Sequence, residues 1–251
     1  MIETGISGGV QHIRLNRPEK KNALTGDMYT AFAEALERGN AEGSGVRVHL
    51  VTGVPGAFTA GNDIGDFLAF ASRGSMTDAP VARFLRALVA CERPIVAAVD
   101  GLAIGVGTTM LLHCDMVLAS PRSVFRTPFI DLGLVPEAGS SLLAPALMGH
   151  ARAFELLCLG EAFDAEAACR AGLVNRIVAE EELEASAEAI AHKIAAKPQE
   201  ALAISRRLLR GDRAALETRV EEEIAAFAAR LVSPEASAAF KAFMERARPS
   251  G

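Results

Sequence analysis

One glutamate stands out by its setting. Glu137 follows the largely apolar run PFIDLGLVP and precedes Ala-Gly-Ser-Ser. An ordinary glutamate at such a place would be a solvated residue in the first turn of a helix, stabilised by the helix dipole. If Phe129, Leu132, Leu134 and Val135 formed an apolar wall around it, they would disfavour the charged carboxylate and make Glu137 a stronger base. The pattern leaves two interpretations, a surface residue or a base that moves protons.

Two glycine-bearing turns could supply the second half of such a site. The segment VTGVPGAFTAGNDIGDF has small residues around Ala60 and Gly61, and Asn62 or Asp63 is suited to cap a following helix. The segment VDGLAIGVGTTMLL places glycines at 101, 105 and 107 in another passage from strand to helix. Helix N-termini leave main-chain N–H groups unpaired, so two such turns side by side could hold one oxygen that gains negative charge. Each turn alone is better explained as a tight turn that packs a helix on a sheet.

The elements that would position these residues follow an alternating pattern. Short valine-rich segments bounded by glycine, proline or polar residues predict strands at 46–53, 93–101 and 114–120. A helix is predicted between the first two, because apolar residues recur there at helical spacing. These residues are Val81, Phe84, Leu85, Leu88 and Val89. From about residue 139 the pattern is helical, apart from a strand or extended link at 172–178, which predicts an α/β body with a helical C-terminal region.

Composition argues against several classes of protein. The 251 residues, half of them hydrophobic, suffice for one large domain, and the net charge of -5 gives no general attraction to nucleic acid or anionic lipid. The chain has no basic leader followed by an apolar stretch and no run of eighteen apolar residues, so we expect no membrane segment and a cytoplasmic protein. The four cysteines and five histidines show no metal-ligand spacing, so no metal site is expected.

Three motifs, in this order and at these intervals, resemble the crotonase family, also called the enoyl-CoA hydratase/isomerase superfamily. They are AFTAGNDI, DGLAIGVGTTMLLHCDMVLAS and FRTPFIDLGLVPEAGSS. The resemblance runs from residue 15 to 178 and implies a ClpP-like spiral of ββα units, which we assign to residues 1–195. It also implies a helical region at 196–251 that forms homotrimers or dimers of trimers. The implied substrate is an acyl-CoA, and because CoA is part of that substrate, no separate cofactor is expected.

The resemblance also implies roles for individual residues. The family's two oxyanion-hole amides correspond to Ala60 and Val106. Lys20 and Lys21, in the segment PEKKNAL, are expected to contact the phosphates of CoA. The other residues expected at the coenzyme are Ala60, Gly61, Asn62, Asp63, Ile64, Gly105, Phe243 and Arg246, the last two often donated by a neighbouring subunit.

Departures from the family pattern narrow the reaction. Enoyl-CoA hydratases use two glutamates to handle water, and this chain has Thr109 and Phe129 at those positions. Neither side chain can take a proton from water at neutral pH, so hydration is not expected. Glu137 resembles the single base of the peroxisomal-type Δ3,Δ2-enoyl-CoA isomerases. The prediction is therefore a double-bond shift, with hydration, hydrolysis or carbon–carbon cleavage of a CoA thioester, or an idle CoA-binding protein, as alternatives.

Overall fold

Two sheets form the body of the protein. The structure is a computed structural model, and it describes residues 1–65 and 78–247, the side chains of 246 and 247 excepted. In these ranges the larger sheet has six strands, in the spatial order β1 (Ile2–Ser7), β2 (Val10–Leu15), β3 (Val48–Thr52), β5 (Ile95–Val99), β7 (Met116–Ala119) and β10 (Arg176–Ile177). The smaller sheet has four, in the order β4 (Ala57–Thr59), β6 (Leu102–Ile104), β8 (Val124–Arg126) and β9 (Phe163–Asp164).

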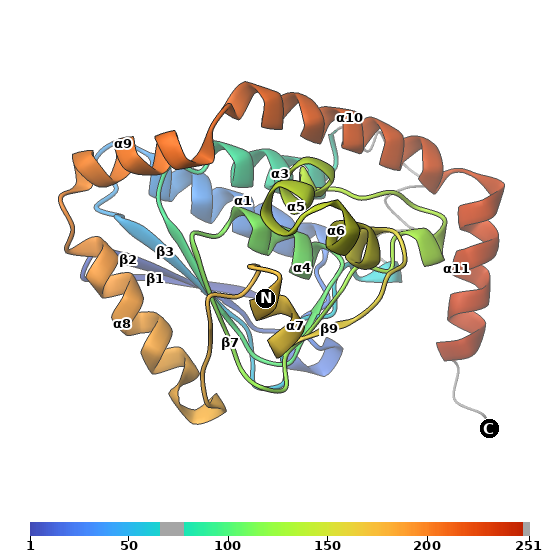
Figure 1. Ribbon diagram of the computed structural model, residues 1–251, viewed down its shortest axis with the longest axis horizontal. Coiled ribbons are helices and arrows are strands. Elements are labelled where there is room, and N and C mark those ends of the chain that lie inside the picture. Colours follow the sequence, from blue (N-terminus) through green and yellow to red (C-terminus); the bar gives the residue numbers. More distant parts are fainter. Residues whose placement is uncertain (66–77, 248–251) are drawn as a thin grey trace.

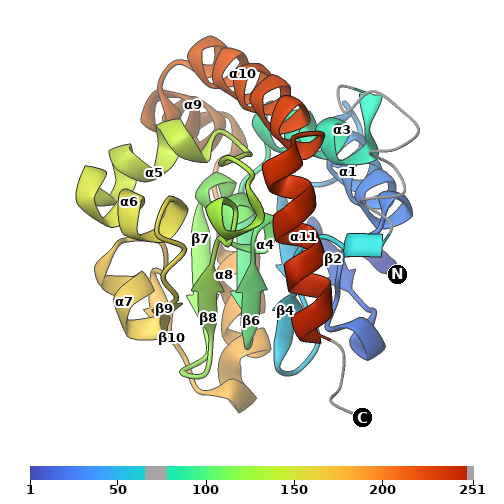
Figure 2. The ribbon, with the colours of Figure 1, turned by 90° about the vertical axis from the view of Figure 1, so that its right-hand side faces the viewer.

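Successive strand pairs alternate between the two sheets. β3 enters the larger sheet and β4 the smaller one, and the pairs β5–β6 and β7–β8 repeat this step. Neighbouring strands of the repeat run parallel in both sheets, so that the ends of β4, β6 and β8 point the same way (Figure 2). The turn that follows β4 therefore lies beside the turn that follows β6.

Helices cover both faces of the larger sheet. The helices of the described ranges are α1 (Gly26–Asn40), α3 (Pro80–Ala90), α4 (Val106–Thr109), α5 (Ser140–Met148), α6 (His150–Leu157), α7 (Ala165–Arg170), α8 (Leu183–Ala195), α9 (Gln199–Arg210), α10 (Arg213–Leu231) and α11 (Pro234–Ala247). The alanines and Leu183 of α8 pack on one face, while α1 and α3 pack on the other (Figure 1). No helix in residues 1–65 and 78–247 is long and apolar enough to cross a membrane.

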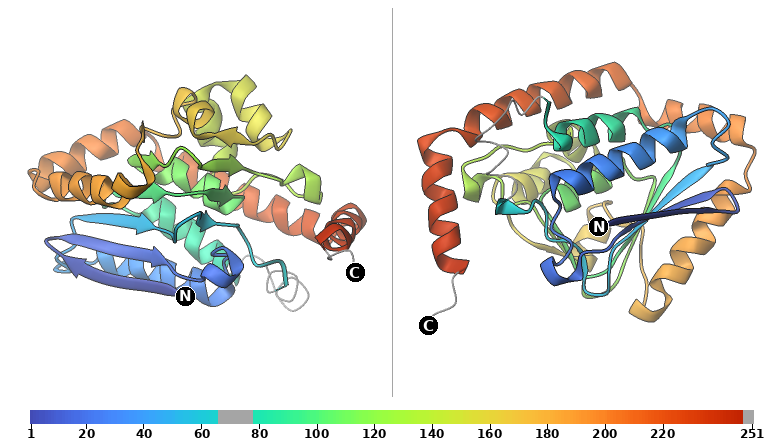
Figure 3. Two further views of the ribbon diagram at one scale, coloured as in Figure 1. Left: turned by 90° about the horizontal axis from the view of Figure 1, so that it is seen from below. Right: turned by 180° about the vertical axis from the view of Figure 1, so that it is seen from behind.

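The C-terminal helices reach back over the body. α10 lies across α3, and Val220 and Ile224 of α10 belong to the main hydrophobic core (Figure 1). α11 then turns down at the end of the molecule away from α8 and α9 (Figure 3). It packs so closely on the segment before Glu137 that a Cβ at Gly133 would lie 2.9 Å from the Ala236 backbone.

The α/β body with its helical C-terminal region is confirmed, as are the predicted strands at 46–53, 93–101 and 114–120, which contain β3, β5 and β7. The sequence pattern did not indicate the hairpin of β1 and β2, because β1 is an exposed edge strand without a buried face. It also missed β4, β6 and β8, since a strand of three residues is too short to show an alternation. The division at residue 195 stays a prediction.

Candidate active site

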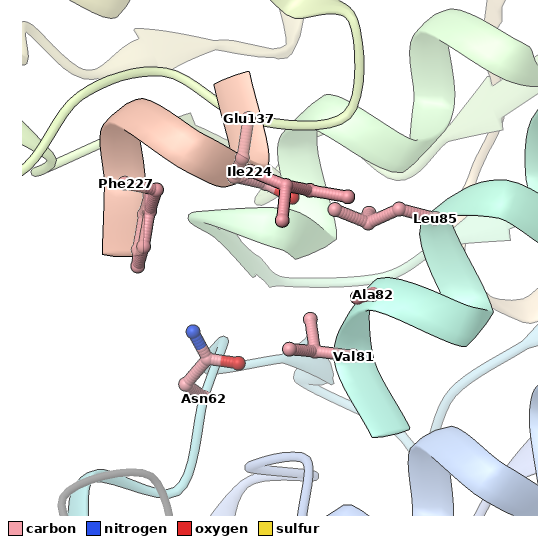
Figure 4. A pocket seen from close by; sticks show the side chains of 7 residues that line it. All are labelled: Asn62, Val81, Ala82, Leu85, Glu137, Ile224 and Phe227. Atoms are coloured by element: carbon pink, nitrogen blue, oxygen red, sulfur yellow. The ribbon is translucent and has the colours of Figure 1, made fainter. Parts of the chain in front are cut away.

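A small pocket lies where α3, α10 and the first glycine turn meet. In the described part of the chain its lining residues are Asn62, Val81, Ala82, Leu85, Glu137, Ile224 and Phe227. Figure 4 shows Glu137 and Asn62 entering from opposite sides, with the side chains of α3 on one flank and Phe227 of α10 on the other. The lining is apolar except for these two residues, and the cavity measures about 30 Å³, room for a water molecule.

Glu137 is buried in this pocket. Its residue exposure is 7%, and its Oε1 accepts a hydrogen bond from the Thr109 hydroxyl, while Oε2 has no hydrogen-bond partner among the described residues. Burial raises the pKa of Glu137 from 4.5 to about 8, the Thr109 hydrogen bond opposes this rise, and the charge of Glu223 adds to it. Glu137 is therefore a carboxyl group with one fixed oxygen and one free oxygen, and it can exchange a proton near neutral pH.

The loop that carries Glu137 is held in an unusual conformation. Ala138 has a φ of 61°, a left-handed value that costs a residue with a Cβ about 1 to 2 kcal/mol. The Ala138 carbonyl accepts a hydrogen bond of 2.7 Å from Nε2–H of the buried His113. Burial lowers the pKa of His113 to about 4, so the ring is neutral and has one N–H to donate at neutral pH.

The two glycine turns are in direct contact, as the parallel pairing of β4 and β6 requires. A Cβ at Gly61 would lie 2.8 Å from the Ile104 carbonyl oxygen, and Gly61 has a φ of 86°. A Cβ at Gly107 would lie 2.4 Å from Cγ2 of Thr59. Glycine is needed at Gly61 because the Ile104 backbone approaches too closely for a side chain, and at Gly107 because the Thr59 side chain does.

The predicted oxyanion-hole role of the Ala60 amide is not supported. Its N–H donates a hydrogen bond of 2.9 Å to the Lys21 carbonyl and is therefore already paired. Asn62, two residues later, lines the pocket, and its main-chain N–H has no acceptor among the described residues. The N–H of Val106, the first residue of α4, likewise donates to no acceptor in the described ranges. Asn62 and Val106 thus each offer a free amide, one on each of the two contacting turns, in the described ranges.

The side chain of Asn62 is oriented by a buried tyrosine. The Tyr29 hydroxyl, from α1, donates a hydrogen bond to Asn62 Oδ1, which leaves the amide nitrogen of Asn62 facing the pocket (Figure 4). Burial, and then the charge of Glu137, raise the pKa of Tyr29, so this phenol keeps its proton. The prediction that Asn62 caps a following helix can be followed only through Ile64 and Gly65, which are helical, because residues 66–77 lie outside the described ranges.

The other residues expected at the coenzyme surround the first turn or lie apart from it. Lys20 and Lys21 are exposed, and no carboxylate among the described residues forms an ion pair with either. Asp63 forms an ion pair of 2.8 Å with Arg17. Ile64 packs against the cluster of Phe129 and Phe227, and Gly105 precedes α4 with a φ of 58°.

Phe243 and Arg246 lie on α11. Phe243 is 40% exposed, and the side chain of Arg246 lies outside the described part of the structure. Neither lines the pocket at Glu137 in the described residues, so the prediction that they reach a coenzyme from a neighbouring subunit stays open.

Thr109 and Phe129 lie in the core of the site. Thr109 is fully buried and is the hydrogen-bond donor to Glu137. Phe129 packs edge-on against Phe227, with ring centroids 6.5 Å apart. Neither position brings a second carboxylate to the pocket, so Glu137 is the one acid among its described lining residues.

Sequence reasoning missed the contribution of α10. Val220, Ile224 and Phe227 follow helical spacing and form its buried face, and Glu223 lies on that same face. An acid within an apolar stripe was the available signal, because a charged residue is buried only where it finds hydrogen-bond partners. Tyr29 gave no such signal, since an aromatic residue on the buried face of α1 looks like any other core residue.

Comparisons with known proteins identify the family of the chain. Residues 5–250 match the family model described as Enoyl-CoA hydratase/isomerase. Enoyl-CoA delta isomerase 2 of Rattus norvegicus is 34% identical over 246 residues, which cover 95% of this chain and 62% of the rat protein. The chain therefore spans less than two thirds of the length of that relative.

Further relatives carry different reaction names. A probable enoyl-CoA hydratase of Mycobacterium leprae is 32% identical over 241 residues, 94% of this chain and 92% of that protein. The crystal structure of an enoyl-CoA hydratase/isomerase from Pseudoalteromonas atlantica T6c superposes with a TM-score of 0.91 at 41% identity, covering 100% of this chain and 99% of the other. Since both reaction names occur among these relatives, the reaction has to be argued from the residues of the pocket.

Proposed function

We propose that this chain, which belongs to the enoyl-CoA hydratase/isomerase family, catalyses the shift of a double bond from C3 to C2 of an acyl-CoA thioester. One observation carries the proposal. Glu137 is the only acid among the described residues that line the pocket, and its buried Oε2 has no hydrogen-bond partner among them. A reaction that removes a proton and returns it needs one carboxylate, whereas the addition of water is served by two.

Glu137 has the properties that such a base needs. Its pKa of about 8, raised mainly by burial, lies near the pH at which an enzyme works. In the proposed reaction Oε2 removes a proton from C2 of a 3-enoyl thioester, and the electron pair is shared by C2, C4 and the thioester oxygen of the resulting dienolate. The same carboxyl group then returns the proton to C4. Proton and electron counts balance without a co-reactant.

The developing charge on the thioester oxygen requires hydrogen-bond donors. The main-chain N–H groups of Asn62 and Val106 have no acceptor among the described residues and lie on two turns that touch each other, which supports them as the oxyanion hole. Loss of one such donor typically costs about 2.7 to 4 kcal/mol of transition-state stabilisation. Tyr29 assists indirectly, since its bond to Oδ1 keeps the Asn62 side chain from covering this position.

The coenzyme would bind beside the first turn. Lys21 contributes its carbonyl to Ala60 N–H, so its ammonium group and that of Lys20 begin next to the backbone that would hold the thioester. Both are exposed cations of the kind that contact phosphates. Phe243 and Arg246, as donors from a second subunit, and a homotrimer or dimer of trimers remain predictions.

A direct test uses two substrates and two variants. We expect wild-type protein to convert trans-3-hexenoyl-CoA into the conjugated 2-enoyl thioester, followed by its ultraviolet absorbance, and to leave trans-2-hexenoyl-CoA unhydrated. Glu137→Gln should reduce the isomerase kcat by about a thousandfold, the range expected for loss of a general base. Asp131→Asn is a matched control, because Asp131 belongs to the same segment but is exposed and paired with Arg126.

Each result has a definite meaning. Isomerase activity of Glu137→Gln close to wild type would eliminate Glu137 as the base. Hydration of trans-2-hexenoyl-CoA at a rate above that of isomerisation would replace the isomerase proposal with a hydratase. Turnover of neither thioester, together with retained CoA binding, would favour the idle CoA-binding protein.

A further inference from the structure

A second buried carboxylate lies beneath the loop that carries Glu137. Glu223 extends from α10 and is 6% exposed. Its Oε2 accepts a hydrogen bond of 2.6 Å from Gly139 N–H, and its Oε1 accepts one of 2.9 Å from Ser141 N–H. Both oxygens are satisfied by the backbone at the beginning of α5, which is how a buried carboxylate avoids a large desolvation penalty.

This arrangement replaces a local helix cap with a distant one. The residue before α5 is Gly139, which has no side chain to accept hydrogen bonds from the first turn. A larger residue at Gly139 would be strained, because the backbone has a φ of 68° there and a Cβ would lie 2.5 Å from Cδ1 of Leu216 of α10. The loop and α10 are therefore fitted to each other, and Glu223 supplies the cap.

Three consecutive residues of the loop are each attached to a different element. The Glu137 side chain is bonded to Thr109 at the end of α4, and the Ala138 carbonyl is bonded to His113 in the turn that follows α4. Glu223 binds the third residue, Gly139. Because Ala138 is held in a left-handed conformation, attachments on both sides of it are needed to keep the loop from relaxing.

We propose that Glu223 is a positioning residue for Glu137, fixing the loop that carries this base through Gly139 and Ser141. This inference rests on the proposed function only where activity is the measured quantity. It gives α10 a role in the chemistry that is separate from its contribution to the pocket wall.

The charges around Glu223 are consistent with this role. Burial raises the pKa of Glu223, while its hydrogen bonds from Ser141 and Gly139 and the nearby Arg219 of α10 oppose that rise. Arg219 itself is bonded to Glu222 and to the Ser141 hydroxyl. On the facing helix α3, Arg86 is bonded to Glu221. The charge of Glu223 is one cause of the raised pKa of Glu137, after burial.

The experiment compares three variants by kinetics and by titration. Glu223→Gln should lower kcat for trans-3-hexenoyl-CoA by about tenfold or more, with KM nearly unchanged, because a base that moves by a fraction of an ångström loses much of its rate. The ascending limb of kcat/KM against pH should move to lower pH, since a nearby negative charge is gone. Glu223→Asp should also lose rate, but its limb should stay in place because the charge remains.

The control is Glu217→Gln, which removes an exposed carboxylate of the same helix that pairs only along the surface with Arg213. It should leave both kcat and the position of the limb as in the wild type. A Glu223→Gln protein with wild-type kcat, or with an unshifted limb, would overturn the proposal. A plain structural cap would lower the stability without moving the limb.

A carboxyl titration by ¹³C NMR separates this inference from the proposed function. The Glu137 signal, assigned by its absence in Glu137→Gln, should titrate at lower pH in Glu223→Gln than in the wild type, whether or not the protein turns over a thioester. If Glu223→Gln does not fold, the wild type still decides: the amide protons of Gly139 and Ser141 should shift with the titration of a buried carboxyl. If the amide signals of Gly139 and Ser141 did not change with pH, the proposed attachment of the loop to Glu223 would be refuted.

Discussion

Two helices of the C-terminal region each bring a charged side chain to a carboxylate of the body, with opposite consequences. α9 supplies the buried Arg206, whose Nε lies 2.8 Å from Oδ1 of Asp115. The other oxygen of Asp115 accepts a 2.8 Å hydrogen bond from Ile95 N–H, so both oxygens are fixed. α10 instead brings the like charge of Glu223 toward Glu137, which keeps one oxygen without a partner in the described residues. A buried acid is available for proton transfer only where its surroundings do not compensate its charge.

The largest effect expected from this contrast is a gain in the free energy of unfolding when the uncompensated carboxylate of Glu137 is removed. The pKa of Glu137 is raised from 4.5 to about 8, mainly by burial, so the folded protein keeps a proton that the unfolded chain releases. The stability from this proton is complete below about pH 4.5 and is lost as the pH rises through about 8. Relative to wild type, Glu137→Gln should therefore gain about 4 kcal/mol in free energy of unfolding between pH 4 and pH 9.

Urea unfolding of both proteins at the two pH values measures this gain. Any constant cost of fitting the glutamine amide cancels in the difference between the two pH values. A difference that does not change with pH would mean that Glu137 ionises like an exposed glutamate, and the contrast with Asp115 would disappear.

At Asp115, whose charge is compensated, removal of the partner should instead lower the free energy of unfolding. Arg206→Leu leaves Asp115 without its main partner and removes the donor to the Cys91 carbonyl, so we expect a loss of about 3 kcal/mol at pH 7. Arg207→Leu, the exposed neighbour on the same helix, should change the stability by no more than about 0.5 kcal/mol. Equal losses in the two variants, again by urea unfolding, would show that Arg206 contributes through its apolar stem alone.

A smaller effect is expected where the surroundings of Glu137 do provide a donor. The Thr109 hydroxyl lowers the pKa of Glu137 by its hydrogen bond, so Thr109→Val should move the ascending limb of kcat/KM to higher pH. Below that limb the activity should fall by about tenfold, the value of one hydrogen bond to a charged group. Thr109→Ser keeps the hydroxyl and should retain the wild-type limb. A limb that stays in place in Thr109→Val would exclude Thr109 as a partner of the ionised base.

The smallest effect should come from a carboxylate of α10 that faces solvent. Glu221 pairs with Arg86 through two hydrogen bonds of 2.6 and 2.8 Å, but Glu221 is exposed and Arg86 is only half-buried. Glu221→Gln should cost no more than about 0.5 kcal/mol in thermal unfolding and should not move the pH profile. A shift as large as that of Glu223→Gln would mean that any charge on α10 acts on Glu137, regardless of burial.

The sequence was most informative where the signal is local. The segment around Glu137 combines a carboxylate with apolar neighbours within a few residues, and the valine-rich strands β3, β5 and β7 each show their pattern within one stretch. The choice between the main-chain amides of Ala60 and Asn62 as oxyanion-hole donors could not be made from a local pattern. Ala60 and Asn62 both flank Gly61, and only the contact of Ala60 N–H with the distant Lys21 carbonyl removes it as a free donor.

Long-range pairing also explains why Glu223 was not predicted. Its partners, Gly139 and Ser141, are far away in the chain, and nothing in their own sequence signals a missing cap except a glycine before α5. Backbone hydrogen bonds of this kind depend on how α10 lies across the body, and a pattern read within single segments does not contain that information.

The place of α10 has a consequence for how the protein is made. A ribosome releases the strands of both sheets and the loop of Glu137 well before it synthesises residues 213–231. Until then the loop lacks its hydrogen bonds to Glu223, and the pocket lacks Ile224 and Phe227. A chain that ends at Gly211 should therefore turn over no thioester, so that reactivity emerges only when translation is nearly complete.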